Sequence, residues 1–363
     1  MMDWLSSGRC DRFRYMRTDR TTLQDTNELD MFSDGGSIEY NALTDIKISG
    51  SLPFVRLPDI GNDYVRVYSV SELDGVVEQV IHGTFIIATP SSTIQHEVRK
   101  GDADIYSLLQ IVSDAGISSP LFIPAGTNAI TYAKGMVEVL GLTCLADSSA
   151  HTLAAPKNYD AGTSCLEVVN DLCQAAHFAN ADIDPSGTVL LQRYVDPSSK
   201  APTFVLRDDK KCVFASDVKY EFDIYAVPNV SVAVMSNEDV CLSATATNND
   251  ALSPFSVVNR GRQIVYVETF SEVESLADLT QKALDALTEK SSAIESVEIR
   301  HVYVPFQVGQ CIKLEYLDAR YAFTGIAVKR NMTLSPGMPC STRLQRFERG
   351  FVPSLTTSNP SGS

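Results

Sequence analysis

Cysteine and histidine residues that could bind a metal ion occur together in one stretch of the chain. Cys173 and His177 are four residues apart, and Cys165 lies two helical turns earlier. Residues four apart share a helix face, so this spacing could present a thiolate and an imidazole to one zinc ion. Zinc needs three or four ligands, and no second cluster with ligand spacing lies nearby. We therefore expect a buried cysteine and a partly exposed histidine at a helix end, without metal.

The segment that begins at Asp182 and Asp184 resembles the start of a calcium-binding loop. Its residues Asp182-Ile183-Asp184-Pro185-Ser186-Gly187 satisfy the first EF-hand positions, but the twelfth position, which should be a bidentate glutamate, is Arg193. Asp-Pro-Ser-Gly is instead a favourable turn sequence. The sequence therefore predicts a β-turn without calcium.

Motifs for covalent catalysis and nucleotide binding are missing from the sequence. It contains no Gly-x-Ser-x-Gly and no Ser-x-x-Lys before a suitable helix. Gly-x-Gly-x-x-Gly and the P-loop are also missing, so no nucleotide cofactor is expected. His82, His96 and His301 lie in or beside expected strands, where structural or surface roles are usual. We predict no catalytic, cofactor-binding or metal-binding residues and no enzymatic activity.

The elements that would position these residues are strands near both ends of the chain and helices in the middle. Alternating runs predict strands at 37–52, with a break at 41–44, and at 63–70 and 76–89. Turn residues between these runs favour an antiparallel sandwich or barrel. Further strands are expected at 188–194, 203–206, 218–225, 230–235, 263–269, 299–304, 311–316, 322–329 and 343–347.

Helical periodicity is confined to a few segments. It predicts helices at 104–115, 127–140 and 164–178, the last opening with a capping box of Ser164 and Glu167. A second capping box, Ser271 with Glu274, precedes a long helix at 271–290. The Ser/Thr/Pro-rich segment from 353 to 363 is expected to fray.

Composition and charge exclude several broad classes. The 363 residues are 44% hydrophobic and 21% charged, which is ordinary for a globular protein and excludes wholesale disorder. The net charge of −15 argues against a large nucleic-acid-binding face. No run of about 18 apolar residues occurs, so no membrane-spanning helix is expected. The first ten residues lack an apolar h-region, so no secretory signal is expected. Eight cysteines without a Cys-x-x-Cys pair favour a reduced protein made in the cytosol.

Charge is distributed unevenly along the chain. Residues 1–20 hold five arginines against three aspartates, whereas residues 21–45 hold six acidic residues and no lysine or arginine. A second basic stretch lies near the end and comprises Lys329, Arg330, Arg343, Arg346 and Arg349, with Glu348 as the acid among them. This pattern fits either solvated faces or a separation of charge between faces of an assembly.

Several motifs in order resemble the baseplate-hub, or tail-tip hub, family of tailed bacteriophages, whose members include minor tail proteins. The first motif is Gly35-Gly36-Ser37-Ile38-Glu39-Tyr40-Asn41, followed by residues 46–52, and the second is Ile123-Pro124-Ala125-Gly126-Thr127-Asn128. The third is Ala161-Gly162-Thr163-Ser164-Cys165-Leu166, followed by Asn170-Asp171-Leu172 and the turn at 184–187. The fourth is Val227-Pro228-Asn229-Val230, and the fifth is Arg260-Gly261-Arg262 with the helix that follows. The resemblance covers roughly residues 30–350.

The resemblance implies a mainly β fold with an α/β insertion. Two antiparallel β-barrels like those of tail-tube proteins would flank a middle domain that contains helices. The expected domains are a first barrel at 1–98, completed by strands within 203–235, an α/β middle domain at 99–202, a second barrel at 236–350 with the helix at 271–290, and a flexible tail at 351–363.

The resemblance also implies a structural role in the virion, at the tail tip, after assembly in the host cytoplasm. A homotrimeric ring would adapt the hexameric tail tube or distal tail ring to a threefold tip and gate the DNA channel. Its partners would be the distal tail or tube ring, the tape measure protein, and a central fibre or other tip protein. DNA would pass without specific binding, and no membrane span is expected. The alternatives are a tail protein that also binds a receptor or carbohydrate, and an envelope hydrolase.

The charge pattern suggests one arrangement of such a ring. The acids at 21–45 would line the channel and repel DNA phosphates, and the basic stretches at 9–20 and 329–349 would face acidic neighbours away from the channel.

Overall fold

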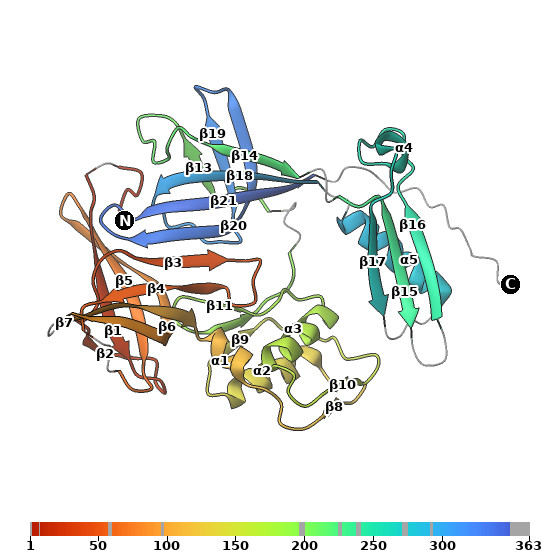
Figure 1. Ribbon diagram of the computed structural model, residues 1–363, viewed down its shortest axis with the longest axis horizontal. Helices are drawn as coiled ribbons and strands as arrows, with labels where there is room; N and C mark the ends of the chain where they lie inside the picture. The colour runs from red at the N-terminus through yellow and green to blue at the C-terminus, as the bar shows by residue number, and fades with distance from the viewer. Residues whose placement is uncertain are drawn as a thin grey trace. The chain divides into compact units, whose positions relative to one another are not determined.

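The structure is a computed structural model, and its description covers residues 2–6, 8–56, 60–95, 98–195, 200–223, 227–236, 241–270, 275–290 and 293–348. The chain divides into two compact units (Figure 1). The first combines Met1–Val218 with Glu298–Leu344, and the second combines Lys219–Val297 with Gln345–Ser363. The expected frayed tail, the capping box at Ser271, and His96 lie outside the described residues.

The first unit is built on a large sheet that joins both ends of the chain. Its N-terminal strands are β1 (Cys10–Thr18), β2 (Asp25–Glu28), β3 (Gly36–Asn41), β4 (Ile48–Phe54), β5 (Tyr64–Leu73), β6 (Val76–Gln95) and β7 (Val98–Ser107). Its later strands are β13 (Phe204–Arg207), β19 (Cys311–Tyr316) and β20 (Tyr321–Leu334). The unit boundaries fall within two further strands, β18 (Ala293–Val302) and β21 (Pro339–Glu348), which belong to the first unit from residue 298 onward and up to residue 344, respectively. The order is β18-β21-β20-β3-β4-β7-β6-β5-β1-β2, with β19 paired to β20 and β13 to β19.

The contact between β3 and β20 connects the two halves of this sheet. The strands pair antiparallel from Gly36 opposite Leu334 to Asn41 opposite Lys329. Every second residue of β3 is buried, including the fully buried Ile38. Met332 on β20 is fully buried as well. The alternation that predicted strands here thus corresponds to one buried and one solvent-facing side of the sheet.

The insertion between β7 and β13 contains helices and small sheets, as expected for an α/β insertion. Its elements are α1 (Leu109–Asp114), β8 (Leu121–Ile123), α2 (Ala129–Val139), β9 (Cys144–Ala146), β10 (Lys157–Tyr159), α3 (Cys165–Ala175), β11 (Asp182–Ile183) and β12 (Val189–Leu191). The side chains of Asn128 and Ser164 cap α2 and α3 by accepting hydrogen bonds from Thr131 N (2.9 Å) and Leu166 N (3.2 Å). Both helices therefore begin where the sequence predicts.

The helix predicted at 104–115 is wrong in its first half. Residues 104–107 belong to β7, and α1 begins only at Leu109. Ala103 and Ile105 are both fully buried, and β7 lies between β4 and β6. The apolar residues of this segment fit both a strand and a helix. The strand forms because alternate side chains are buried and the backbone pairs with strands on both sides.

The second unit combines a three-stranded sheet with one long helix. Its elements are β14 (Lys219–Asp223), β15 (Val230–Ser236), β16 (Cys241–Thr247), α4 (Val257–Arg260), β17 (Val265–Phe270) and α5 (Leu276–Lys290). The sheet has the order β16-β15-β17, and α5 packs on β15 and β16. Leu279, Ala283 and Leu287 of α5 are fully buried in this contact. Ser275 Oγ accepts a hydrogen bond from Asp278 N (3.1 Å) at the start of the helix.

The strands within 203–235 pair differently from expectation. Among the described residues, none of these strands pairs with the first seven: β13 pairs with β19, β14 with β18, and β15 with β16 and β17. The N-terminal strands are instead continued by β20 and β21 through β3. The mainly β fold is confirmed, and the expected division into two barrels, a middle domain and a tail stays a prediction. Within the described residues, every helix is too short or too polar to cross a bilayer.

Candidate functional site

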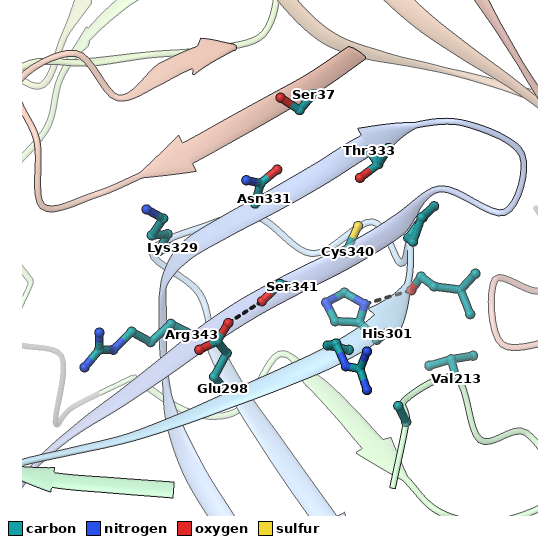
Figure 2. Close-up of a pocket in the computed structure, with 14 residues that line it drawn as sticks. Ser37, Val213, Glu298, His301, Lys329, Asn331, Thr333, Cys340, Ser341 and Arg343 are labelled. Carbon is teal, nitrogen blue, oxygen red and sulfur yellow. Dashed lines mark hydrogen bonds between the residues drawn. The ribbon is translucent and has the colours of Figure 1, made fainter. Parts of the chain in front are cut away.

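A groove lies on the solvent-facing side of four neighbouring strands of the first unit (Figure 2). Its volume is about 900 Å³. The lining residues come from β3, β18, β20, β21 and the segment before β14: Ser37, Val213, Ala215, Glu298, Arg300, His301, Val302, Lys329, Asn331, Thr333, Pro339, Cys340, Ser341 and Arg343. The groove is therefore made mainly of hydroxyl, amide and charged side chains.

The alternation of β20 explains why the groove is polar. Lys329, Asn331 and Thr333 line it, whereas Arg330 and Met332 between them are buried. Successive side chains of a strand point to opposite faces, so one strand supplies both the core and the groove wall. The alternation of polar and apolar residues in β20 is visible in the sequence. Only the pairing of β3 with β20 shows which strands contribute to the same face.

The charged groups of the groove are balanced by neighbours. Lys329 Nζ lies 2.9 Å from Glu39 Oε2 on the paired strand β3. Ser341 Oγ donates to Glu298 Oε1 over 2.7 Å (Figure 2), and Arg300 forms an ion pair with Asp217. These pairs are mostly solvent-exposed, where each contributes only about 0–1 kcal/mol. The groove can therefore exchange these partners for groups of another molecule at low cost.

Cys340 and His301 both line the groove, which raises the question of a thiol–imidazole pair. Burial raises the pKa of the Cys340 thiol to about 12, and the thiol donates to Met338 O. Burial lowers the pKa of His301 to about 4, and its nitrogens contact Thr342 Oγ1 (2.8 Å) and Val302 O (2.7 Å). A cysteine nucleophile needs a lowered thiol pKa and a base that takes its proton. This pair has neither feature.

A buried arginine lies on the other face of the same strands. The Arg330 guanidinium lies 4.5 Å from the ring centroid of Tyr40 and 5.3 Å from that of Tyr303, and it donates to Phe306 O over 2.6 Å. Within the described chain no carboxylate lies at ion-pair distance from it. Nearby, His82 is buried, and burial together with the charge of Arg330 lowers its pKa to about 3. Arg330 therefore acts in the core, although the sequence placed it in a surface basic stretch.

The calcium-like segment forms a turn, as predicted, and the turn contacts the large sheet. Asp184 Oδ1 accepts hydrogen bonds from Ser186 Oγ (2.6 Å) and Thr188 N (2.9 Å), so this carboxylate is used within the turn. Gly187 has a φ of +98°, and a Cβ there would lie 2.9 Å from Leu108 Cδ1. Arg66 donates to Ser186 O (3.0 Å), and Thr84 donates to Pro185 O (3.0 Å). The turn thus joins the insertion to β5 and β6.

Cys173 and His177 are in different environments. Cys173 is fully buried in α3, where burial raises the pKa of its thiol to about 12. His177 is exposed, lies beyond the end of α3, and has a φ of +58°. The two residues therefore do not share a helix face. Among the described residues, no group of three or more His, Cys, Asp and Glu side chains is arranged to hold a metal ion. The expectation of no bound metal stays a prediction.

The acidic stretch at 21–45 is partly neutralised by basic residues from other parts of the chain. Four of its six carboxylates form ion pairs: Asp25 with Arg66, Glu28 with Arg14, Asp30 with Arg56 and Glu39 with Lys329. The first three distances are 2.8–2.9 Å. A strong negative field along a channel needs uncompensated acids, so this pairing weakens the expectation that the stretch repels DNA.

Comparison with solved structures shows where similar folds occur. The fold is similar to that of several tail proteins. A tail protein from Neisseria meningitidis MC58 matches with a TM-score of 0.67 and 13% identity over 92% of this chain and 97% of its own. The 43 kDa tail protein of prophage MuSo2 from Shewanella oneidensis matches with a TM-score of 0.64 and 8% identity, over 93% and 98% of the two chains.

A third tail protein supports the same conclusion. The prophage tail protein from Listeria monocytogenes EGD-e matches with a TM-score of 0.54 and 11% identity, over 92% of this chain and 94% of its own. Neither a protein-family profile nor a curated protein matches the sequence. The resemblance inferred from the motifs is therefore confirmed for the fold.

Proposed function

We propose that this chain is a structural hub protein of a phage tail tip. The main support is the fold, which this chain shares with three tail proteins over at least 92% of its length. The groove adds support, because burial raises the pKa of the Cys340 thiol and so favours its protonated form. The imidazole of His301 contacts the hydroxyl of Thr342. Both observations favour a role in assembly over a role as a hydrolase.

In the proposed assembly, three copies form a ring at the tail tip. The ring adapts the sixfold tail tube or distal tail ring to a threefold tip and gates the DNA channel. It contacts the tube or distal tail ring, the tape measure protein, and a fibre or other tip protein. A protein with many strand edges suits such a ring, because neighbouring chains can cover those edges.

The copy number at the tail tip tests this proposal. Electron microscopy of assembled tails, with quantitative mass spectrometry, should find three copies of the chain per tip. The purified chain should form trimers by native mass spectrometry. One or six copies per tail, or the absence of the chain from purified tails, would contradict the proposal.

A further inference from the structure

The residues before β1 cover a cluster of aromatic side chains in the first unit. We call residues 2–6 and 8–9 the N-terminal strap. Within it, Met2 and Trp4 are buried, with 5% and 7% of their surfaces exposed. The ring of Trp4 packs against that of Tyr303 with 5.5 Å between the centroids, and the guanidinium of Arg9 lies over Trp4 at 5.0 Å from its centroid. Arg9 also donates to Tyr303 O over 3.0 Å. The strap is therefore packed against the core of the unit.

The N-terminal strap joins two distant parts of the large sheet. Met2 N donates to Glu78 Oε2 on β6 over 3.0 Å. Lys211 Nζ, in the segment before β14, donates to Asp3 Oδ2 over 2.6 Å, and Tyr303 follows β18. Five strands stand between β18 and β6 in the sheet: β21, β20, β3, β4 and β7. The strap therefore links places that the sheet itself connects only through these five strands.

This attachment consists mainly of side-chain contacts and lacks strand pairing. Among the described strap residues, backbone–backbone hydrogen bonding is limited to a local bond from Ser6 N to Asp3 O (3.1 Å). Strand pairing begins at Cys10, opposite Glu72 on β5, and continues along β1. The ion pair of Asp3 with Lys211 is solvent-exposed and therefore weak. Detaching the strap thus breaks few hydrogen bonds, whereas detaching β1 breaks a whole ladder.

The cluster beside the strap holds a buried cation with incomplete hydrogen bonding. Tyr303 is 3% exposed, and its ring contacts both Trp4 and the guanidinium of Arg330, which is 4% exposed. Among the described residues, Arg330 Nε has no hydrogen-bond partner and no carboxylate lies at ion-pair distance from it. A buried charged donor without a partner costs free energy that hydration returns. Access of water to Arg330 therefore offsets part of the cost of opening the strap.

We propose that the N-terminal strap is a lid that opens as one unit while the large sheet stays folded. Local opening occurs in contiguous segments that lack protected backbone hydrogen bonds, and the strap lacks them. Met2 and Trp4 lie two residues apart, so they leave the core together and uncover Tyr303. The open state thus presents an aromatic cluster that is sealed in the closed state. This proposal does not depend on the number of copies at the tail tip.

Tryptophan fluorescence tests the lid, because Trp4 is the one tryptophan in the 363 residues and reports on the strap alone. Hydrogen exchange of peptides from β1 and β5, followed by mass spectrometry, reports on the adjoining sheet. Both are measured in the same urea titration of the chain. Trp4 should become accessible to acrylamide at a lower urea concentration than that at which β1 and β5 lose protection.

Removal of the two polar contacts that hold the strap from outside should open it further. The contact variant combines Glu78→Ala with Lys211→Ala. It should raise the open fraction without urea by about tenfold and leave the protection of β1 and β5 unchanged. The matched control combines Lys134→Ala with Glu138→Ala, which removes an exposed ion pair of α2 whose side chains are 41% and 50% exposed. The control should change neither measurement.

Three results would overturn the proposal. The first is exposure of Trp4 at the same urea concentration as loss of protection in β1 and β5, in both the unmodified chain and the contact variant. The second is an equal shift of both transitions in the contact variant, since the strap would then unfold with the sheet. The third is quenching of Trp4 in water as strong as in urea, which would mean that the strap does not close. If the contact variant does not fold, the two transitions of the unmodified chain decide by themselves.

Discussion

The guanidinium of Arg66 donates a hydrogen bond to the carbonyl oxygen of Ser186, 120 residues further along the chain, over 3.0 Å. The same side chain donates to Thr84 Oγ1 (2.8 Å) and Leu23 O (3.0 Å) and forms an ion pair with Asp25 at 2.9 Å. One buried cation on β5 therefore holds together the acidic stretch, the adjacent strand and the turn of the insertion.

Substitution of Arg66 should strongly destabilise the first unit. The side chain is only 8% exposed, and its removal takes away the cation paired with Asp25 and the donor to the carbonyl oxygens of Leu23 and Ser186, although Asp25 keeps its hydrogen bonds from Thr18 and Tyr68. Arg66→Ala should lower the free energy of unfolding by about 3–5 kcal/mol in urea denaturation. Arg14→Ala removes the exposed ion pair with Glu28 and should cost no more than about 1 kcal/mol. Equal effects of the two changes would contradict this role of Arg66.

The apolar stripe of α5 should stabilise the second unit. Leu287 is fully buried against β15 and β16, so Leu287→Ala should cost about 2–5 kcal/mol. Leu276 lies at the start of the same helix with 41% of its surface exposed, so Leu276→Ala should stay within about ±0.5 kcal/mol. Chemical denaturation followed by circular dichroism measures both. A small loss for Leu287→Ala would show that the stripe is not packed in solution.

Thiol labelling should separate buried from exposed cysteines. The pKa values of Cys173 and Cys340 are both raised to about 12 by burial, so neither should react with iodoacetamide at pH 8 in the native state. Cys10 and Cys212 are exposed and should be labelled. Peptide mass spectrometry identifies the modified residues, and all should react in denaturant. Rapid native labelling of Cys340 would instead support a reactive thiol beside His301.

Stability should fall on mild acidification because two histidines are buried in the neutral form. Burial lowers the pKa of His82 to about 3 and that of His301 to about 4, below the value of about 6.5 for an unfolded histidine. The unfolded chain therefore binds protons first, and this stability is complete above pH 6.5 and is lost as the pH falls toward 4 and then 3.

Two measurements check the histidine prediction. Each histidine should contribute a slope of at most about 1.4 kcal/mol per pH unit in urea denaturation between pH 6.5 and pH 4. The ring proton resonances of His82 and His301 should not titrate between pH 7 and pH 5. Titration of either ring in that range would show that the histidine is accessible to protonation in the folded state.

The sequence predicted local structure better than long-range pairing. The alternation at 37–52 correctly predicted β3 and β4. The helical periodicity at 127–140 and 164–178, the latter with the capping residue Ser164, correctly predicted α2 and α3. Alternation fixes which side chains share a face but does not identify the partner strand. The pairing of β3 with β20 therefore could not be predicted, and neither could the groove that depends on it.

The partner strands are unknown from the sequence, and this also explains why some charged residues were assigned to the surface although they are buried. The sequence shows Arg330 within a basic stretch, yet its position opposite Tyr40 on the paired strand buries it among aromatic rings. The basic stretch at 9–20 contains β1 (Cys10–Thr18), in which Asp11, Tyr15 and Thr18 are buried. Buried charges depend on partners far away in the sequence, so local composition does not reveal them.

The pairing of β3 with β20 has a consequence for synthesis on the ribosome. Asn41 and its partner Lys329 are separated by 288 residues, which take roughly 15–60 s to translate at about 5–20 residues per second. During this interval the backbone groups of β3 that will pair with β20 have no native partner. An open strand edge is a template for pairing with other chains, so aggregation of nascent chains should be greatest before β20 emerges. Chaperone binding to the first 100 residues would protect this edge, and slower translation would increase the need for it.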